Sequence, residues 1–115
     1  MDYRIPDNLG QTVTDEPIVP EGPAAYFSTL PLRAMLGAML AAGVPAELSL
    51  SAGAYLCNQV MYTLLHHLAQ TGQNIPAGFI HLPALPQQAA SAPAPYATMS
   101  LETTLTGLRA ALSVL

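Results

Sequence analysis

One stretch constrains the fold of this chain more than any other. Residues 49–62 read Ser-Leu-Ser-Ala-Gly-Ala-Tyr-Leu-Cys-Asn-Gln-Val-Met-Tyr and contain the only cysteine, Cys57. Residues 46–50 end in an apolar and polar alternation and run into Gly53, which predicts a short strand followed by a turn. An amphipathic helix ending near Gln70 is predicted next by apolar residues four apart: Leu56, Val60, Leu64 and Leu68, with Met61 and Leu65 beside them. The stretch therefore reads as strand, turn and helix.

Cys57 falls in the first turn of that predicted helix. Unpaired backbone N–H groups and the positive end of the helix dipole favour an anion there, and the thiolate is the nucleophilic form of cysteine. A single cysteine in an apolar stretch is also often a small buried hydrophobic residue. Spacing alone leaves both interpretations open.

The composition indicates one small domain with few surface charges. Of the 115 residues, 51% are hydrophobic and 9% are charged, so we expect much of the chain to be buried, in part against something outside it. The net charge of -4 argues against nucleic acid and anionic membranes as partners. The longest apolar run, residues 34–44, is too short for a bilayer, and the first residues do not resemble a signal peptide. A lone free thiol fits a reducing, cytoplasmic location.

The flanking segments predict a loop and two further helices. Residues 1–27 are rich in proline and acidic residues and predict an extended loop segment. Ser28 or Thr29 is expected to cap a helix with a proline in its first turn, closed by Gly43. After a proline-rich loop over residues 83–98, Ser100 is expected to cap a last helix with four leucines on one face, Leu101, Leu105, Leu108 and Leu112.

Residues 77–82, Ala-Gly-Phe-Ile-His-Leu, predict a second buried strand. Strand, helix and strand in this order form a βαβ unit with parallel strands. The helix after Cys57 carries the chain about 20 Å away, and the strand returns about 17 Å. His81 should therefore return to the sheet edge where the helix begins, and open α/β sheets bind ligands at that edge. Cysteine and histidine there can act as nucleophile and general base, although a histidine ending a buried strand is often a hydrogen-bonded core residue.

Other catalytic and binding motifs are weak or missing from the sequence. His66 and His67 project about 100° apart on a helix, so one is expected to face solvent and a metal site is not predicted. Ser49 and Ser51 do not lie in the Gly-x-Ser-x-Gly pattern of serine hydrolases. No phosphate loop, dinucleotide fingerprint or metal cluster is present, so no cofactor is predicted.

Several motifs in order resemble the pyroglutamyl peptidase I family. They are Arg-Ile-Pro-Asp-Asn at residues 4–8, Gly-Pro-Ala-Ala-Tyr-Phe-Ser-Thr-Leu-Pro at 22–31, the stretch at 49–62, and Gly-Phe-Ile-His-Leu-Pro at 78–83. The resemblance implies a three-layer α/β/α fold, a Cys-His-Glu triad, cytoplasmic location and no cofactor. It also implies homo-oligomers that remove amino-terminal pyroglutamate from peptides.

By position, the resemblance makes Cys57 the nucleophile and His81 the base. It places Arg4, Tyr55 and Leu56 at the oxyanion and the substrate, with the Tyr55 ring where the family packs an aromatic residue on pyroglutamate. Without the resemblance, Arg4 reads as half of a surface ion pair with a neighbouring acid. Backbone N–H groups near Cys57 would stabilise the oxyanion.

The sequence departs from the family in one large respect. In the family, the triad glutamate and several strands precede the motif that begins here at Arg4, and none of the seven acidic residues matches that glutamate. We therefore expect residues 1–115 to form a single partial domain: a loop segment over 1–27, then a helix, the βαβ unit, a loop and a last helix over 28–115. Loss of the orienting carboxylate costs about 10⁴-fold in kcat in a comparable triad. An inactive fragment or interaction module and a redox-sensing thiol protein remain as alternatives.

Overall fold

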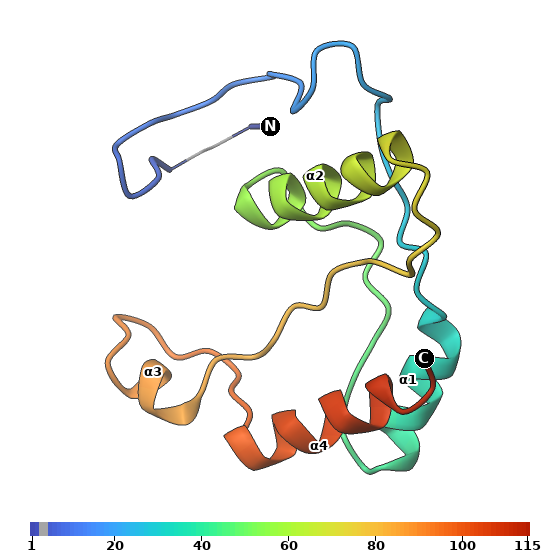
Figure 1. Ribbon diagram of the computed structural model, residues 1–115. Helices are drawn as coiled ribbons and strands as arrows, with labels where there is room; N and C mark the ends of the chain where they lie inside the picture. The colour runs from blue at the N-terminus through green and yellow to red at the C-terminus, as the bar shows by residue number, and fades with distance from the viewer. Residues whose placement is uncertain (3–4) are drawn as a thin grey trace. The chain divides into compact units, whose positions relative to one another are not determined.

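The computed structural model describes residues 1–2 and 5–115, and four helices form within this part of the chain (Figure 1). They are α1 (Leu32–Ala41), α2 (Leu56–Gln70), α3 (Pro86–Ala90) and α4 (Leu101–Leu112). The chain divides into two compact units, residues 1–30 with 49–79 and residues 31–48 with 80–115. In the described part, no helix has the length and apolarity needed to cross a bilayer.

The two predicted strands do not form as paired strands. Residues 46–50 and 77–82 lie outside all regular elements, and the β-pairing found among the described residues is one isolated parallel bridge between Ala84 and Thr98. A strand exists only where a neighbouring strand accepts and donates its backbone hydrogen bonds. The apolar pattern of these segments is therefore compatible with a sheet, but this chain does not supply the sheet.

The first unit is built on one side of α2. Tyr62, Leu65 and Leu68 are the buried residues of this helix. Leu65 and Leu68 form a core cluster with Ala77, and the partly buried Tyr26 and Met61 pack against that cluster. The helix is thus covered by irregular chain from residues 26 and 77 rather than by a second helix.

Residues 28 and 29 tie the two irregular segments of the first unit together. The hydroxyl groups of Ser28 and Thr29 donate to the Ala77 carbonyl at 3.2 and 3.3 Å, and the Ala77 N–H donates to the Thr29 hydroxyl at 2.8 Å. The prediction that one of these hydroxyl groups caps α1 is therefore wrong. Helix α1 begins at Leu32, with Pro31 at its N-cap position and no side-chain cap.

The second unit contains the short helix α3 and is built on a pair of packed helices, α1 and α4. Helix α4 buries its small residues Thr104, Gly107 and Ala111. A Cβ atom on Gly107 would lie 2.9 Å from Val44 Cγ1 and 3.0 Å from Met39 Cε. The missing side chain of Gly107 is therefore what allows Met39 and Val44 to approach α4 so closely.

The helix ends follow local signals in the sequence. Gly43 and Gly72 have φ of 75° and 65°, and each follows the C-cap residue of its helix. In both cases the residue after the glycine donates to a carbonyl five residues back, Val44 to Met39 and Gln73 to Leu68, as in a Schellman motif. The predicted cap at Ser100 is confirmed, since its side chain accepts from the Thr103 N–H at 3.1 Å. The short helix α3 was not predicted.

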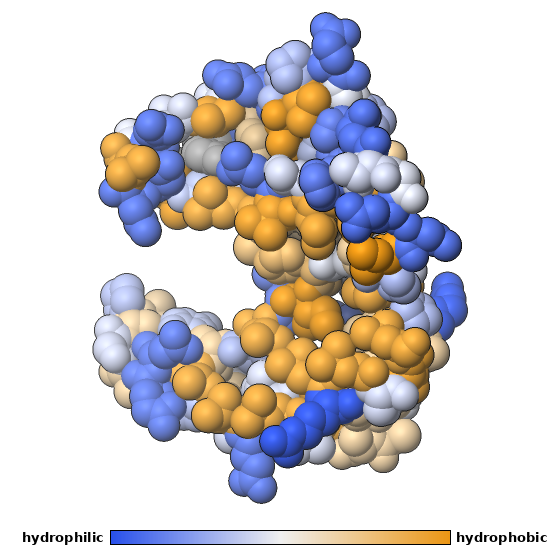
Figure 2. All heavy atoms as spheres, in the orientation of Figure 1, coloured by the Kyte–Doolittle hydropathy of each residue, from blue (hydrophilic) through white to orange (hydrophobic). Residues whose placement is uncertain are grey.

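Both units leave apolar side chains exposed. Figure 2 shows apolar side chains gathered over α2 and over α4 on the face that it presents. On α2 the exposed ones are Leu56, Val60 and Leu64, and on α4 they are Leu101, Leu105 and Leu112. The residues that α4 buries are instead Thr104, Gly107 and Ala111, and Leu108 of the predicted leucine face is half-buried.

Candidate functional site

The candidate site is the amino-terminal end of α2. Cys57 is the second residue of the helix, after the N-cap residue Tyr55 and the first helical residue Leu56. The side chain of the N-cap residue Tyr55 does not cap the helix, and the first turn itself contains no acidic residue. The backbone N–H groups of a first turn favour an anion, which is the setting that the sequence predicts for a thiolate.

The loop before α2 is held by its two serines. The Ser49 hydroxyl donates to the Ser51 carbonyl at 2.8 Å, and the Gly53 N–H donates to the Ser51 side chain at 2.9 Å. Gly53 has φ of 84°, a conformation that favours glycine, so the predicted glycine turn is confirmed. The loop turns the chain sharply into the helix, and the side chains of its two serines stabilise this turn by hydrogen bonds.

Three of the predicted site residues lie side by side at this turn. Cys57 is a half-buried free thiol. Tyr55 is half-buried, and its hydroxyl donates to the Pro6 carbonyl at 3.3 Å. The Leu56 side chain is 42% exposed. The helix start thus combines a thiol, an aromatic ring and an accessible apolar side chain.

The other two predicted site residues are not at the helix start. Arg4 lies outside the described residues. His81 lies in the extended segment that follows residue 80, with an exposed side chain. It belongs to the second unit, whereas Cys57 belongs to the first. The predicted meeting of cysteine and histidine at one sheet edge stays a prediction.

The amino-terminal residues contact the turn that leads to Cys57. The Asp2 N–H donates to the Ala54 carbonyl at 3.0 Å. The Asn58 side-chain amide lies 3.9 Å from the Met1 sulfur. Together with the Tyr55 contact to Pro6, these bonds hold described residues from both sides of position 4 against residues 54–58.

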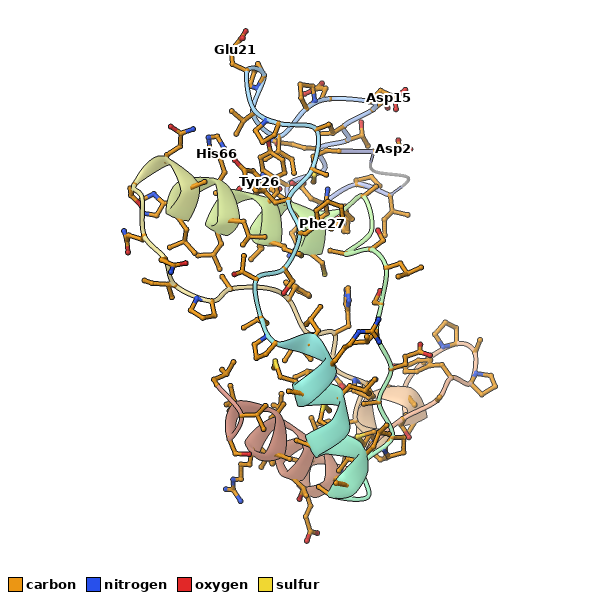
Figure 3. All side chains as sticks on the ribbon, turned by 90° about the vertical axis from the view of Figure 1, so that its right-hand side faces the viewer. Asp2, Asp15, Glu21, Tyr26, Phe27 and His66 are labelled. Atoms are coloured by element: carbon orange, nitrogen blue, oxygen red, sulfur yellow. The ribbon has the colours of Figure 1, made fainter. Side chains whose placement is uncertain are left out.

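An aromatic cluster on the buried side of α2 was missed by the sequence interpretation. The Tyr26 hydroxyl lies 2.9 Å from His66 Nδ1, and the two side chains are seen beside α2 in Figure 3. The Tyr62 and His66 rings stack at 5.9 Å, and the Tyr26 and Tyr62 rings meet edge to face at 5.0 Å. The spacing of Tyr62 and His66, four residues apart on a helix, was the available signal.

Tyr62 is the buried phenol of this cluster. Its hydroxyl donates to the Pro23 carbonyl at 2.7 Å. Burial raises the pKa of the Tyr62 phenol above its ordinary value of 10.0, and the neighbouring Tyr26 phenol raises it further. Tyr62 therefore stays neutral at physiological pH and serves as a hydrogen-bond donor that holds the irregular chain on α2.

A small cavity of about 190 Å³ lies beside the same cluster. Met1, residues 17–19 and 22–26, Asn58, Met61 and Tyr62 line it. Cys57 is not among the lining residues, so this cavity is separate from the thiol.

His66 and His67 behave as the sequence predicts, since His66 is half-buried and His67 is exposed. Across the described part of the chain, no three His, Cys, Asp or Glu side chains are grouped closely enough to hold a metal ion.

The chain is similar to peptidases of known name and structure. It is 51% identical over 114 residues to pyrrolidone-carboxylate peptidases of Yersinia pestis and Yersinia pseudotuberculosis, covering 98% of this chain and 52% of each relative. Among solved structures, a mutant pyrrolidone carboxyl peptidase from the hyperthermophile Pyrococcus furiosus shares 45% identity with a TM-score of 0.90. That alignment covers 99% of this chain and 56% of the Pyrococcus chain.

These similarities establish the fold class and its extent. The chain has part of the α/β fold of pyroglutamyl peptidases, and it spans about half the length of the curated relatives it matches. This explains why residues 46–50 and 77–82 have strand-like patterns without a sheet. The sequence profile of pyroglutamyl peptidases matches residues 1–115, and the chain belongs to this family of cysteine peptidases.

Proposed function

We propose that this chain carries the nucleophile and the base of a pyroglutamyl-peptidase, a cysteine omega-peptidase that removes pyroglutamate from the amino terminus of peptides. The observation that carries the proposal is the position of Cys57: a half-buried free thiol in the first turn of α2, behind the Gly53 turn, at an uncapped helix end. The relatives at 51% identity are named pyrrolidone-carboxylate peptidases.

The proposed chemistry is acyl transfer to sulfur. The His81 imidazole takes the Cys57 proton, and the thiolate attacks the carbonyl carbon between pyroglutamate and the next residue. The resulting oxyanion is stabilised by backbone N–H groups at the start of α2, and Arg4 adds a positive charge near it. The imidazolium then protonates the leaving amine, which leaves a thioester that water hydrolyses. No cofactor takes part in these steps.

The substrate contacts follow from the same turn. The Tyr55 ring packs on the flat pyroglutamate ring, and the accessible Leu56 side chain adds apolar contact. The bonds from Asp2 to Ala54 and from Tyr55 to Pro6 join described residues of the amino-terminal segment to the same turn. Free pyroglutamate and a shortened peptide are the products.

Two features of the proposal concern the whole protein. Activity requires the part of the fold that this chain does not include, which carries the carboxylate that orients His81, and residues 1–115 are then one incomplete domain. The active form is a homo-oligomer that works in the reducing cytoplasm, where a free catalytic thiol is kept reduced.

The test is release of a fluorescent amine from a pyroglutamyl amide. The 115-residue chain is compared with a fusion in which the part of the Yersinia pestis relative left unmatched by the alignment is joined upstream of it. We expect turnover in the fusion and at least about 10⁴-fold less from the chain alone, since the histidine then lacks its orienting carboxylate.

In the fusion, Cys57→Ala and His81→Ala should each lower kcat by several orders of magnitude, because the members of a triad act as a unit. Cys57→Ala should also abolish a thioester adduct visible by mass spectrometry after acid quenching. His67→Ala is the matched control, since His67 is exposed on α2 outside the proposed site, and it should keep the activity. A fusion that folds but releases no amine would overturn the proposal, and reversible oxidation of its thiol would then favour the redox alternative.

A further inference from the structure

The cavity of about 190 Å³ is bounded by the start of α2 and by the irregular chain that covers this helix. Asn58, Met61 and Tyr62 line it from α2, and Met1 with residues 17–19 and 22–26 line it from the irregular chain. All of these residues belong to the first unit, which also contains Cys57. The helical wall of the cavity thus begins at the residue that directly follows the candidate nucleophile.

The cavity lies to one side of Cys57 around the helix, and Leu56 lies to the other side. At about 100° of rotation per residue, Leu56 is about 100° from Cys57 in one sense. Met61 and Asn58 are about 40° and 100° from Cys57 in the opposite sense. In the proposed function, the pyroglutamate ring contacts Tyr55 and Leu56. The thiol attacks the carbonyl that joins this ring to the next residue, so the next residue extends toward the cavity.

The size and chemistry of the cavity suit one uncharged side chain. Among the described residues that line it, Asn58 and Tyr62 offer polar groups, Ile18, Val19 and Met61 offer apolar surface, and no side chain carries a charge. A cavity of about 150 Å³ accommodates a benzene molecule, whereas pockets for larger ligands reach about 300–1,000 Å³. The cavity is therefore large enough for a single side chain and too small for a peptide.

Hydrogen bonds fix the wall that the irregular chain forms. The Tyr62 hydroxyl donates to the Pro23 carbonyl at 2.7 Å, and the Gly22 N–H donates to the Val19 carbonyl at 3.0 Å. A Cβ atom on Gly22 would collide with the Tyr62 hydroxyl, so glycine is what allows this close approach. The wall is thus held by bonds within the first unit, and a preorganised pocket loses less entropy when it binds.

We propose that this cavity is the subsite for the side chain of the residue that follows pyroglutamate, and that it selects uncharged side chains of intermediate size. The inference rests on the proposed function, because it takes the scissile bond to lie at Cys57. Cys57 itself does not line the cavity, as expected if the sulfur meets a backbone carbonyl and the cavity receives a side chain. A lysine or glutamate side chain would lose hydration there without gaining a charged partner.

The experiment lets three peptides compete for the upstream fusion in one reaction. They are the amides of pyroglutamyl-leucine, pyroglutamyl-lysine and pyroglutamyl-glutamate, and mass spectrometry follows the consumption of each. The relative rates give the ratios of kcat/KM, which are the measure of specificity. We expect the leucine peptide to be preferred about tenfold over each charged peptide, at the lower end of what an apolar pocket provides.

A charge placed in the cavity should change this selectivity. Asn58→Asp should raise the ratio of the lysine rate to the glutamate rate by at least about tenfold, because a carboxylate attracts one side chain and repels the other. Gln59→Glu is the matched control, since Gln59 is exposed and does not line the cavity, and it should change the ratio by less than about twofold.

Both variants should fold, because a carboxylate in the first turn of a helix interacts favourably with the helix dipole. Each added charge also acts on the Cys57 thiolate, but this effect is common to the three peptides and cancels in the ratio. Equal ratios in Asn58→Asp and Gln59→Glu would overturn the proposal.

A second measurement needs no catalysis and uses the 115-residue chain alone. NMR follows its isotopically labelled methionine methyl groups while N-acetyl-leucine amide is added, with N-acetyl-glycine amide as the probe that lacks a side chain. The Met61 methyl signal should shift saturably with the leucine probe and much less with the glycine probe. Met35 is the internal control, since it is buried in the second unit and should not shift. A Met61 signal that stays in place would overturn the proposal.

Failure of the subsite and failure of the proposed function are distinguishable. A fusion that releases no amine from any of the three peptides removes the proposed function, and the shift of Met61 then decides by itself whether the cavity receives a side chain. An active fusion in which Asn58→Asp leaves the ratios of the parent unchanged removes the subsite alone.

Discussion

The two units of this molecule cover their helices in different ways. In the second unit, α1 and α4 pack directly on each other, and the contact is made close by small residues of α4. In the first unit, α2 packs large side chains such as Tyr62 and Leu65 against irregular chain. Two helices can cover each other's contact faces, whereas irregular chain covers only one side of α2. The comparison shows that a helix pair and a helix with irregular chain reach burial by different means, small residues in one case and large side chains in the other.

The largest effect is expected from the core of the first unit. Leu65→Ala removes a side chain that is 5% exposed and contacts Leu68 and Ala77, so the free energy of unfolding should fall by about 2–4 kcal/mol. Leu64→Ala is the matched control on the same helix, because the Leu64 side chain is 43% exposed, and it should cost less than about 1 kcal/mol. Urea unfolding followed by circular dichroism measures both. Equal costs would mean that the two faces of α2 are equally buried.

A smaller effect is expected in the second unit. Gly107→Ala brings a Cβ atom within 2.9 Å of Val44 Cγ1, and overpacking of this kind costs about 1–3 kcal/mol, partly offset by the better helix propensity of alanine, about 1 kcal/mol. Gly37→Ala on α1 is the control, because a Cβ there meets no atom within 4 Å and should stabilise the helix by about 0.5–1 kcal/mol.

The same urea titrations measure the two glycine variants. The informative result is that the change in the free energy of unfolding should have opposite signs in the two variants. Both substitutions add one methyl group inside a helix of the same packed pair. Stabilisation by Gly107→Ala would show that α1 and α4 are not in close contact at this point.

The sequence predicts the features that depend on residues near one another. Helix α2 and the cap at Ser100 are read from spacings of three and four residues, and Gly43 ends α1 because it can adopt a positive φ. Cys57 was placed at a helix start for the same reason, since the Gly53 turn and the apolar periodicity are adjacent to it. Local sequence pattern thus predicts the part of the candidate site that lies at the start of α2.

Features that join distant residues were not predictable in this way. The hydroxyl groups of Ser28 and Thr29 donate to the Ala77 carbonyl, 49 and 48 residues away, instead of capping α1. The contact between Tyr26 and His66 spans 40 residues. The strand predicted over residues 77–82 could form only beside partner strands, and a local pattern does not indicate whether the chain contains them. The relation of Cys57 to His81 belongs to this second class.

The smallest effect concerns pH and the first unit alone. Because burial raises the Tyr62 pKa above 10.0, the unfolded chain releases this proton at a lower pH than the folded chain. The stability from the neutral phenol is thus present below about pH 10 and is lost as pH rises through the folded pKa. The chain has no lysine, which removes a common group that titrates in the same range. Unfolding at pH 9–11 should show a downward slope in stability that Tyr62→Phe reduces.

Tyr96→Phe is the control for that slope, since the Tyr96 ring is 48% exposed and lies in the second unit. It should leave the pH dependence of the parent unchanged. Tyr62→Phe also removes the bond to the Pro23 carbonyl, so its stability at pH 7 should be lower than that of the parent. A slope that persists in Tyr62→Phe would assign the pH dependence to another group, and the cluster on α2 would then hold the irregular chain by packing alone.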